Sequence, residues 1–377
     1  MLIGIDGNEA NIAKRVGVNK YAFEILWGLY RLRTHKLGKH RLIVYLKNKP
    51  LPDMPPENQY LKYKVLKGGG MWILTKLTSH LIFSKQKPDV FFSPSHYVPF
   101  LVCIPKVCSI MDLGYLEFSG QFKRYDFWQL KFWTAMSIFV SKYIIAISNT
   151  TKIDIVRHYS FASNKVRVSA LAYDKAIFNP NISQDNVRRI KNKYSIVNDY
   201  VLFLSTLKPS KNIEGIIKAF AKVLHNTKNK LQLVIAGKKG WMYESIFEVV
   251  KKHHLEEKVV FTDFLDEKDK PELLKGATVF VSPSFWEGFG LHVLEALAVG
   301  TPVVVSDKGS LLEVVGDAGI IVDPYKIESI AEGMTKVLSL NKVKYNELSR
   351  KCLTQAQKFD WDITAQQTLA VLLSTHV

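Results

Sequence analysis

The stretch TVFVSPSFWEGFGLHVLEALAVGTPVVVSD, residues 278–307, decides the fold. It opens with a short apolar run, turns through a glycine-rich segment, continues as the helical pattern 291–299 and closes with the valine-rich run 301–307. A buried strand, a glycine turn, a helix and a second buried strand make one strand–helix–strand unit of a parallel sheet. Both apolar runs are too continuous for strands with one solvent-exposed face, so we expect helices on both faces of the sheet.

Apolar runs of this kind alternate with helical patterns along the whole chain. We expect strands at 2–6, 41–46, 62–66, 89–92, 106–111, 143–148, 166–171, 200–205, 231–237, 258–264, 278–283, 301–307 and 318–323. This alternation is typical of α/β chains with doubly wound parallel sheets. At 377 residues, the chain also exceeds the size of about 250–300 residues at which a single core stops growing. The sequence therefore predicts two Rossmann-like domains.

A polar stretch near 175–198 interrupts the alternation and marks the expected joint between the domains. We predict an N-terminal domain over residues 1–180, a second domain over residues 195–358, and a terminal helix over residues 359–377. Asp360 precedes this helical pattern and is expected to cap it. The same Asp-Trp-Asp run has the form of a divalent-ion site, but capping explains it, and we expect no metal.

The positive charge of the chain is concentrated in one half. Residues 1–180 contain 26 Lys and Arg against 11 Asp and Glu, a net charge of +15, whereas residues 181–377 contain 26 against 23, a net charge of +3. If the excess of lysine were only a general bias of the organism's proteins, both halves of the chain would carry the same positive charge. The first half is therefore expected to face an anionic partner, such as a membrane surface or a phosphorylated lipid. Nucleic acid is not expected, because no nucleic-acid module is recognisable.

The compartment follows from what the sequence lacks. Three cysteines without metal-ligand spacing favour a reducing environment. No secretory signal is apparent, and charges interrupt each apolar run before the roughly 18–20 residues of a spanning helix. We expect a cytoplasmic protein, peripheral on the inner face of the cell membrane. The segment MWILTKLTSHLIFSK (71–85) either lies in a membrane interface or is a buried Rossmann helix, which is the favoured interpretation.

Candidate site residues lie at the carboxyl ends of the expected strands, where open parallel sheets bind their ligands. Glu287 precedes the helix that follows the run 278–283, and Glu295 stands in its second turn within otherwise apolar sequence. Stabilisation of the helix dipole would explain Glu287 but not Glu295. Bare amides at this helix start can hold a phosphate, and they belong to Gly288, Phe289, Gly290 and Leu291.

The loop STLKPSKN after the run 200–205 contains Ser205, Thr206 and Lys211. A lysine at this place can clamp a second phosphate, and a solvated loop lysine is the plain alternative. In the first half of the chain, Gly17 precedes a helical run and permits close approach of a ligand, although one glycine alone indicates no more than a turn.

Two further candidates follow strands of the first half. His96 comes after the run 89–92 and is a candidate acid or base, and a hydrogen-bonded structural histidine is at least as consistent with its position. Asp112 comes after the run 106–111 and is a candidate on the acceptor side.

Together these motifs resemble the family-4 retaining glycosyltransferases, which have the GT-B fold. Glu287-x7-Glu295, STLKPSKN, VIAGKKGW, VVFTDFLDEKD and GSLLEVVGDAGIIVDP resemble that family strongly, and FFSPSHYVP and IMDLGYLEF match it more loosely. The subgroup that the chain resembles most is the mannosyltransferase-like branch of polysaccharide and lipopolysaccharide assembly. The resemblance implies an α/β chain of GT-B type, with two Rossmann-like doubly wound domains facing across a cleft. It also implies that the terminal helix over residues 359–377 crosses back to the N-terminal domain.

The resemblance also implies roles for the candidate residues. Lys211 would bind the donor diphosphate, Glu287 would contact the donor sugar, and Glu295 would bind the ribose hydroxyls. Gly17 would let its loop close over the diphosphate, and Phe264 would lie in the loop that takes the base. Glu287, Lys211 and His96 are the residues expected to act in catalysis.

The resemblance implies the retaining transfer of a hexose from a UDP- or GDP-linked donor. Mannose is the candidate hexose. The acceptor would be an anionic, lipid-linked or polysaccharide glycan of the cell envelope. Lysine and a helix start neutralise the leaving group, so neither a metal nor another cofactor is expected. The alternative is a catalytically silent nucleotide-sugar-binding partner of another transferase.

Three positions depart from the family pattern. Ser205 and Thr206 stand where many relatives have an arginine. Lys211 would therefore bind the diphosphate without the second positive charge that those relatives have. Met111 stands where many have a histidine, which favours the silent alternative and makes His96 the substitute. His292 replaces a common proline, a change expected to matter little.

Overall fold

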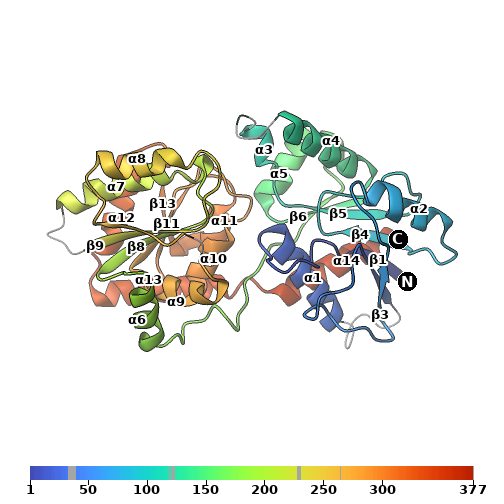
Figure 1. Cartoon of the computed structure of the whole chain (residues 1–377), viewed down its shortest axis with the longest axis horizontal. Helices are drawn as coiled ribbons and strands as arrows, with labels where there is room; N and C mark the ends of the chain where they lie inside the picture. Colours follow the sequence, from blue (N-terminus) through green and yellow to red (C-terminus); the bar gives the residue numbers. More distant parts are fainter. Residues whose placement is uncertain (33–39, 119, 121–123, 227–230, 264, 377) are drawn as a thin grey trace. The chain divides into compact units, whose positions relative to one another are not determined.

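The computed structural model describes residues 1–32, 40–118, 120, 124–226, 231–263 and 265–376, and the chain forms two compact α/β units (Figure 1). Unit 1 comprises Met1–Leu171 with Asp360–Val377, and unit 2 comprises Ala172–Phe359. The expected first domain extended to residue 180, but the chain leaves unit 1 earlier. Residues 172–180 belong to unit 2, and two of their aromatic side chains, Tyr173 and Phe178, are buried.

Unit 1 is built on a parallel sheet whose strand order, in the described residues, is β3-β2-β1-β4-β5-β6-β7. The order reverses between β1 and β4, which pair directly with Ile5 opposite Phe92. The strands are β1 (Leu2–Asp6), β2 (Arg41–Leu46), β3 (Leu61–Val65), β4 (Val90–Ser93), β5 (Lys106–Ile110), β6 (Tyr143–Ala146) and β7 (Val166–Val168).

Helices cover both faces of this sheet (Figure 1). One face carries α2 (Thr78–Phe83), α4 (Arg124–Val140) and α5 (Asn149–His158), and the other carries α1 (Val18–Leu32) and α14 (Trp361–Leu373). Strand β5 contacts both layers: its Cys108 lies in the core below α4, whereas its Ser109 hydroxyl lies 2.8 Å from the phenol of Tyr21 in α1. All five residues of β5 are buried, as expected for a strand that is covered on both sides.

The segment 71–85 forms a π-turn (Ile73–Leu77) followed by α2. Trp72, Leu77 and Leu81 are buried in one cluster with Phe91, and the indole of Trp72 donates to the Leu66 carbonyl at 2.6 Å. One face of this segment is therefore buried in the core, as the buried-helix interpretation predicts, whereas Met71, Ile82 and Phe83 are exposed. Among the helices of the described ranges, none combines the length and the hydropathy that crossing a membrane requires.

Helix α14 lies against α1. The Asp360 carboxylate accepts a hydrogen bond from the backbone N–H of Asp362 at 2.7 Å, which confirms the predicted cap. Gly28 lets the two helices approach closely, because a Cβ at that position would lie 2.5 Å from the Cβ of Ala365. Trp361 is buried, with its ring centroid 6.4 Å from that of Tyr21.

Unit 2 repeats the architecture with the strand order β10-β9-β8-β11-β12-β13, parallel throughout in the residues that the structure describes. Here the order reverses between β8 and β11. The strands are β8 (Asp199–Leu204), β9 (Leu231–Ala236), β10 (Val259–Phe261), β11 (Val279–Ser282), β12 (Val303–Ser306) and β13 (Gly319–Val322). All thirteen expected strands are present, and each begins within two residues of its predicted position.

One face of this second sheet is covered by α7 (Ile213–Asn226), α8 (Glu244–Lys252) and α12 (Ile327–Leu338) (Figure 1). The opposite face is covered by α9 (Lys270–Gly276), α10 (Leu291–Ala298), α11 (Leu311–Val315) and α13 (Lys342–Ala356). The prediction of two doubly wound α/β domains is confirmed for each unit taken by itself.

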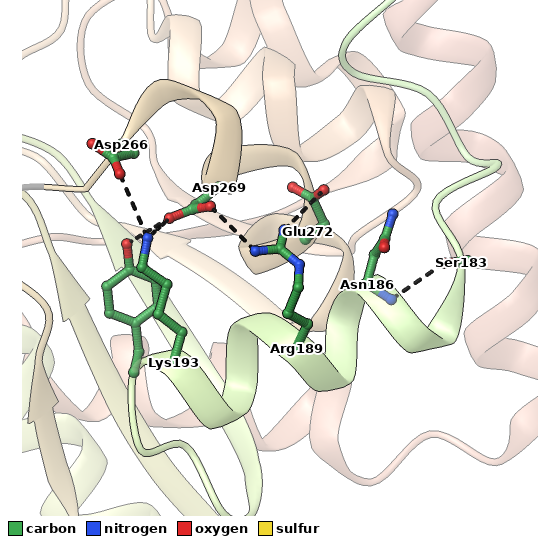
Figure 2. A network of polar contacts seen from close by, with 8 residues as sticks. Ser183, Asn186, Arg189, Lys193, Asp266, Asp269 and Glu272 are labelled. Carbon is green, nitrogen blue, oxygen red and sulfur yellow. Dashed lines mark hydrogen bonds and ion pairs between the residues drawn. The ribbon is translucent and has the colours of Figure 1, made fainter.

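The expected joint contains α6 (Gln184–Lys193), which is docked onto α9 through a buried carboxylate (Figure 2). Asp269 is fully buried and accepts hydrogen bonds from the ammonium of Lys193 and, at 2.9 Å, from the hydroxyl of Tyr194. Burial alone would raise the pKa of Asp269, but these hydrogen bonds hold it below its usual value. Arg189 adds a contact of 3.8 Å to Glu272. The polar residues of α6 thus belong to a helix that is docked onto α9, not to a linker between domains.

Candidate functional site

Two loops meet where the strand order of unit 2 reverses. Strand β8 ends at Leu204 and leads through residues 205–212 into α7, and β11 ends at Ser282 and leads through residues 283–290 into α10. Because β8 and β11 are neighbours in a parallel sheet, their carboxyl ends lie side by side, at the crevice where such sheets bind ligands. The loops are joined by a hydrogen bond of 2.9 Å from the Phe285 N–H to the Ser210 carbonyl.

Lys211 and Glu287 form an ion pair in this crevice. The Lys211 Nζ lies 2.6 Å from the Glu287 Oε1, and the two side chains are only 10% and 17% exposed. The same carboxylate oxygen accepts a hydrogen bond from the Ser284 hydroxyl at 3.0 Å. Burial alone would raise the pKa of Glu287, but the Lys211 ammonium and the Ser284 hydroxyl hold it below its usual value. The structure thus brings two predicted residues together as a charged pair.

The backbone of Glu287 is fixed by the loop after β12. The Glu287 carbonyl accepts hydrogen bonds from both the N–H and the hydroxyl of Ser310, each at 3.1 Å. Gly309, with a φ of +62°, passes so close that a Cβ there would collide with this carbonyl. Sequence reasoning did not single out Gly309 or Ser310, although a Gly-Ser pair after a valine strand was the available signal.

Asn212 ties three loops together and was also missed as a site residue. It adopts a left-handed conformation with φ +54° and is only 8% exposed. Its side-chain amide donates to the Pro283 carbonyl at 3.1 Å and to the Pro324 carbonyl at 2.7 Å. Asparagine tolerates this conformation better than most residues, so its place before a helical run was the signal in the sequence. Asn212 positions the loop that carries Glu287.

Ser205 and Thr206 lie beside Lys211 in sequence and are held by their backbone. The Ser205 N–H donates to the Ala236 carbonyl at 3.1 Å, and the Leu207 N–H donates to the Lys238 carbonyl at 3.0 Å. Gly237, with a φ of +136°, makes this approach possible, because a Cβ there would collide with the Ser205 carbonyl. The side chains of Ser205 and Thr206 are partly exposed, and their contact with a ligand stays a prediction.

A cavity of about 360 Å³ opens next to these loops. Its lining includes Lys208, Asn212, Phe285 and Tyr325, and the last two rings stack with centroids 5.1 Å apart. The ion pair itself is not part of this lining. The cavity therefore adjoins the reversal of strand order on the side of α7.

Helix α10 begins at a glycine. Gly290 has a φ of +94°, and no side chain in the described part of the chain caps the helix. A Cβ at Gly290 would lie 2.5 Å from the Leu311 side chain, so both space and backbone require glycine. The Phe289 side chain packs edge-on against Phe359 with centroids 5.8 Å apart. Binding of a phosphate by the amides of Gly288, Phe289, Gly290 and Leu291 stays a prediction.

Glu295 is a buried acid on α10, with a side chain that is 8% exposed. One of its carboxylate oxygens lies 2.9 Å from the Nδ1 of His292 on the same helix face. His292 stands where a proline is usual and gives this buried carboxylate a polar partner, and the expectation that the exchange matters little stays a prediction. Whether Glu295 binds ribose hydroxyls stays a prediction.

His96 lies in unit 1, just after β4 and beside the reversal of strand order between β1 and β4. Burial lowers the pKa of its imidazole to about 4, so the ring is neutral at pH 7. Its Nε2 is buried and has no hydrogen-bond partner among the described residues. The ring centroid lies 4.0 Å from that of Tyr97. A neutral ring can accept a proton or a hydrogen bond, which is compatible with the predicted role but does not test it.

The remaining predicted residues occupy simpler places. Gly17 precedes α1 with a φ of +53° and open space around it, so its conformation favours glycine and its predicted contact is untested. Asp112 is exposed and accepts a hydrogen bond from the Gly114 N–H at 2.9 Å, which makes it a turn residue before α3 (Gly114–Glu117). Phe264 lies outside the described residues.

Comparison with known proteins finds a family model that matches the part of the chain with these loops. Residues 186–359 match the family model described as "Glycosyl transferases group 1". The "O-antigen chain mannosyltransferase B" of Escherichia coli is 30% identical over 238 residues, which span 61% of this chain and 60% of that protein. The chain thus matches about three fifths of that relative's length.

Two solved structures match essentially the whole chain. Sucrose-phosphate synthase from Thermosynechococcus elongatus has a TM-score of 0.76 at 17% identity, covering 100% of this chain and 99% of its own. Anabaena Alr3699/HepE, solved in complex with UDP and glucose, has a TM-score of 0.74 at 18% identity, with 99% of each chain covered. These likenesses confirm an α/β fold of GT-B type, and the cleft between the domains stays a prediction.

Proposed function

Because residues 186–359 are a glycosyl transferases group 1 domain, we propose that the chain is a hexosyltransferase that uses a nucleotide-sugar donor. The observation that supports this most directly is the ion pair of Lys211 and Glu287, 2.6 Å long, at the reversal of strand order. A fixed cation and an uncapped helix start at one crevice are what a diphosphate leaving group needs. Both features lie within the matched residues.

The proposed donor is a UDP- or GDP-linked hexose, with mannose favoured by the named activity of the Escherichia coli relative. In the proposed retaining reaction, the bond from the anomeric carbon to the diphosphate oxygen breaks. The acceptor hydroxyl forms the new glycosidic bond on the same face, and a diphosphate oxygen takes its proton. Lys211 and the α10 amides stabilise the charge that develops on the diphosphate, so the proposal requires no metal or cofactor.

The acidic residues take the remaining roles in this proposal. Lys211 would exchange Glu287 for the diphosphate, which leaves the Glu287 carboxylate able to contact the sugar that moves. Glu295, buried one helical turn further along α10, would hold the ribose hydroxyls. The proposed acceptor is a lipid-linked or polysaccharide glycan of the cell envelope, approached from the cytoplasmic face of the membrane. Unit 1, with 25 Lys and Arg against 12 Asp and Glu, supplies the positive field for such a partner.

The test is transfer, or donor hydrolysis, by Lys211→Ala and Glu295→Gln variants. Each is expected to lower the rate at least about 100-fold, because each removes a group that holds the donor. Glu295→Gln should melt within a few degrees of wild type, whereas Lys211→Ala leaves Glu287 without its partner and should melt at a lower temperature, so circular dichroism checks that it is folded at the assay temperature. Lys222→Ala is the matched control, because Lys222 is an exposed lysine on α7, 2.6 Å from Glu328, that does not line the cavity beside the site. Wild-type rates in both site variants would exclude the proposed donor site.

The second candidate is a silent nucleotide-sugar-binding partner, favoured by Met111 in place of the family's histidine. A thermal-shift screen against UDP- and GDP-sugars identifies the donor, since a ligand of the native state raises its stability. A single-turnover assay with that donor and a panel of lipid-linked acceptors then separates the two candidates. Binding without transfer would support the silent partner, and transfer would exclude it.

A further inference from the structure

Helix α4 of unit 1 presents a row of aromatic side chains to solvent. Tyr125, Trp128, Phe132 and Phe139 are 76%, 59%, 55% and 65% exposed. Their spacings of three, four and seven residues place them on one helix face, since each residue turns the helix by about 100°. The opposite face, with Ile138, is buried against the sheet. The helix is therefore apolar on both faces, which is unusual for a helix at the surface of a globular unit.

The row extends beyond the helix. The ring of Phe139 contacts that of Phe161 edge-on, with centroids 6.1 Å apart, and Phe161 is itself 54% exposed. We call these five residues, Tyr125, Trp128, Phe132, Phe139 and Phe161, the aromatic surface. Isolated exposed apolar residues are common, but a contiguous row of large rings marks an interaction site.

Lysines stand among these rings. The Lys131 Nζ lies 5.0 Å from the ring centroid of Trp128, and the Lys165 Nζ lies 5.8 Å from that of Phe161. Lys165 also donates to the Phe139 carbonyl at 3.0 Å, which fixes its ammonium beside the row. Residues 124–165 contain six Lys and Arg against two Asp and Glu. The aromatic surface is therefore cationic as well as apolar.

This combination selects among possible partners. A second copy of the chain would set the same lysines against one another in a symmetric contact, which like charges disfavour. An anionic bilayer satisfies both features: aromatic rings settle at the level of the head groups, and ammonium groups meet lipid phosphates. The segment 71–85 is less suited to this role, because Trp72, Leu77 and Leu81 are already buried in the core.

We propose that the aromatic surface, with Lys131 and Lys165, docks the chain on an anionic lipid bilayer. The inference deepens the proposed function, because a lipid-linked acceptor would be met at that bilayer. The rings would enter the interface between head groups and acyl chains, and the lysines would make the binding sensitive to salt and to anionic lipid.

Flotation with vesicles tests the docking. Vesicles are made of phosphatidylcholine alone or mixed with anionic phosphatidylglycerol, and the full chain is compared with a Trp128→Ser, Phe132→Ser double variant. Wild type is expected to float with the mixed vesicles and much less with the neutral ones. The double variant is expected to bind the mixed vesicles on the order of tenfold more weakly, since two inserting rings are gone. Both side chains are mostly exposed, so its melting temperature should match wild type.

Two further variants sharpen the result. Phe83→Ser removes an aromatic ring that is 83% exposed on α2, outside the aromatic surface, and is expected to leave flotation unchanged. A Lys131→Glu, Lys165→Glu variant is expected to lose the preference for anionic lipid. The proposal is overturned if the double serine variant floats like wild type, or if Phe83→Ser weakens flotation equally. It is also overturned if sedimentation shows that the serine substitutions only dissociate a dimer.

Flotation needs no turnover, so it is independent of the proposed reaction. Donor hydrolysis measured without vesicles is expected to be the same in wild type and in the double serine variant. Lys211→Ala, in contrast, is expected to float normally and to lose hydrolysis. A chain that floats but transfers no sugar would refute the proposed function and leave the docking surface intact.

Discussion

A lysine and a glutamate that are both mostly buried, Lys211 and Glu287, face each other in the crevice of unit 2. Removing two charges from water costs more than one contact of 2.6 Å returns in many proteins, so buried ion pairs are poor evidence for stabilisation. Losing one partner is costly, however, because the other is left as an uncompensated charge. In the proposed function, Glu287 keeps Lys211 compensated until a diphosphate replaces it.

Glu287→Gln is expected to lower the free energy of unfolding at pH 7 by roughly 1–3 kcal/mol, because it keeps the shape and removes the charge beside Lys211. The folded pKa of Glu287 lies below its ordinary value of 4.5. The pair therefore contributes stability that is present above that pH and is lost as the pH falls through the lower folded value. Urea unfolding across the acid range should show a weaker pH dependence in the variant. An unchanged pH dependence, or a similar loss in the exposed-pair control Glu214→Gln, would contradict this prediction.

Asp154 of α5 shows the opposite shift. It is 7% exposed, and its Oδ2 is buried without a hydrogen-bond partner in the described ranges of the chain. Burial raises its pKa from 3.8 to about 6, nearby Glu117 adds to the shift, and Arg157 opposes it. Between these two values the folded state binds the extra proton, so stability falls as the pH rises from 3.8 to about 6 and stays lower above it.

Asp154→Asn is therefore expected to stabilise the chain at pH 7 by roughly 1–3 kcal/mol. The gain should shrink as the pH falls through this range and vanish only well below pH 3.8, where Asp154 is protonated in both the folded and the unfolded wild type. Thermal melts at a series of pH values measure it. A variant that is less stable than wild type at pH 7 would show that the carboxylate makes a favourable interaction in solution.

At the scale of elements, the site depends on loops that hold one another through backbone carbonyls. Asn212 at the start of α7 reaches the carbonyls of Pro283 and Pro324, and Ser310 reaches the carbonyl of Glu287. The strands supply a fixed base, and these few side chains decide where the loop with Glu287 stands.

Asn212→Ala and Asn212→Gly separate the two properties of this residue. Both lose the hydrogen bonds to Pro283 and Pro324, so both should weaken donor binding by a similar factor. Alanine must also adopt a φ near +54°, which costs it more than glycine. We expect a destabilisation of roughly 2–4 kcal/mol for alanine and about 1–2 kcal/mol for glycine. Urea unfolding and nucleotide titration measure the two effects, and a glycine variant with wild-type affinity would remove the positioning role.

The strands could be predicted because buried parallel strands are continuous apolar runs between glycine and polar turns. The docking of α6 could not, because Lys193 and its partner Asp269 are 76 residues apart and no local pattern reports their contact. The same holds for the site. Lys211 and Glu287 were predicted singly, but their pairing depends on β8 and β11 being neighbours. Asn212 and Ser310 were missed because they act through hydrogen bonds to backbone carbonyls of distant loops. Every residue has a backbone carbonyl, so no pattern in the sequence marks the partner.

At the scale of the whole molecule, unit 1 is assembled from two separate pieces of chain. Removing residues 360–377 would uncover α1 and delete three large buried apolar side chains, Trp361, Leu369 and Leu372. At about 1.5–3 kcal/mol each, this loss is comparable with the entire stability of a typical domain.

A chain that stops at Phe359 is therefore expected to lose the cooperative unfolding of unit 1 and to keep that of unit 2. Calorimetry should show the second transition alone, within a few degrees of its wild-type temperature. Ile363→Ser, at a position on α14 that is 50% exposed, is the control that should leave both transitions in place. Loss of both transitions in the truncated chain would show that unit 2 depends on unit 1 for its fold.

The late return of α14 also dictates an order of events on the ribosome. The 188 residues of unit 2 are synthesised between the two pieces of unit 1, which takes roughly 10–40 s at about 5–20 residues per second. Throughout that interval the nascent α1 lacks the helix that packs against Tyr21 and Gly28. Unit 2 can complete its folding first, while the N-terminal piece of unit 1 still exposes the apolar face of α1. A nascent-chain chaperone should therefore bind the N-terminal half and be released only when α14 emerges.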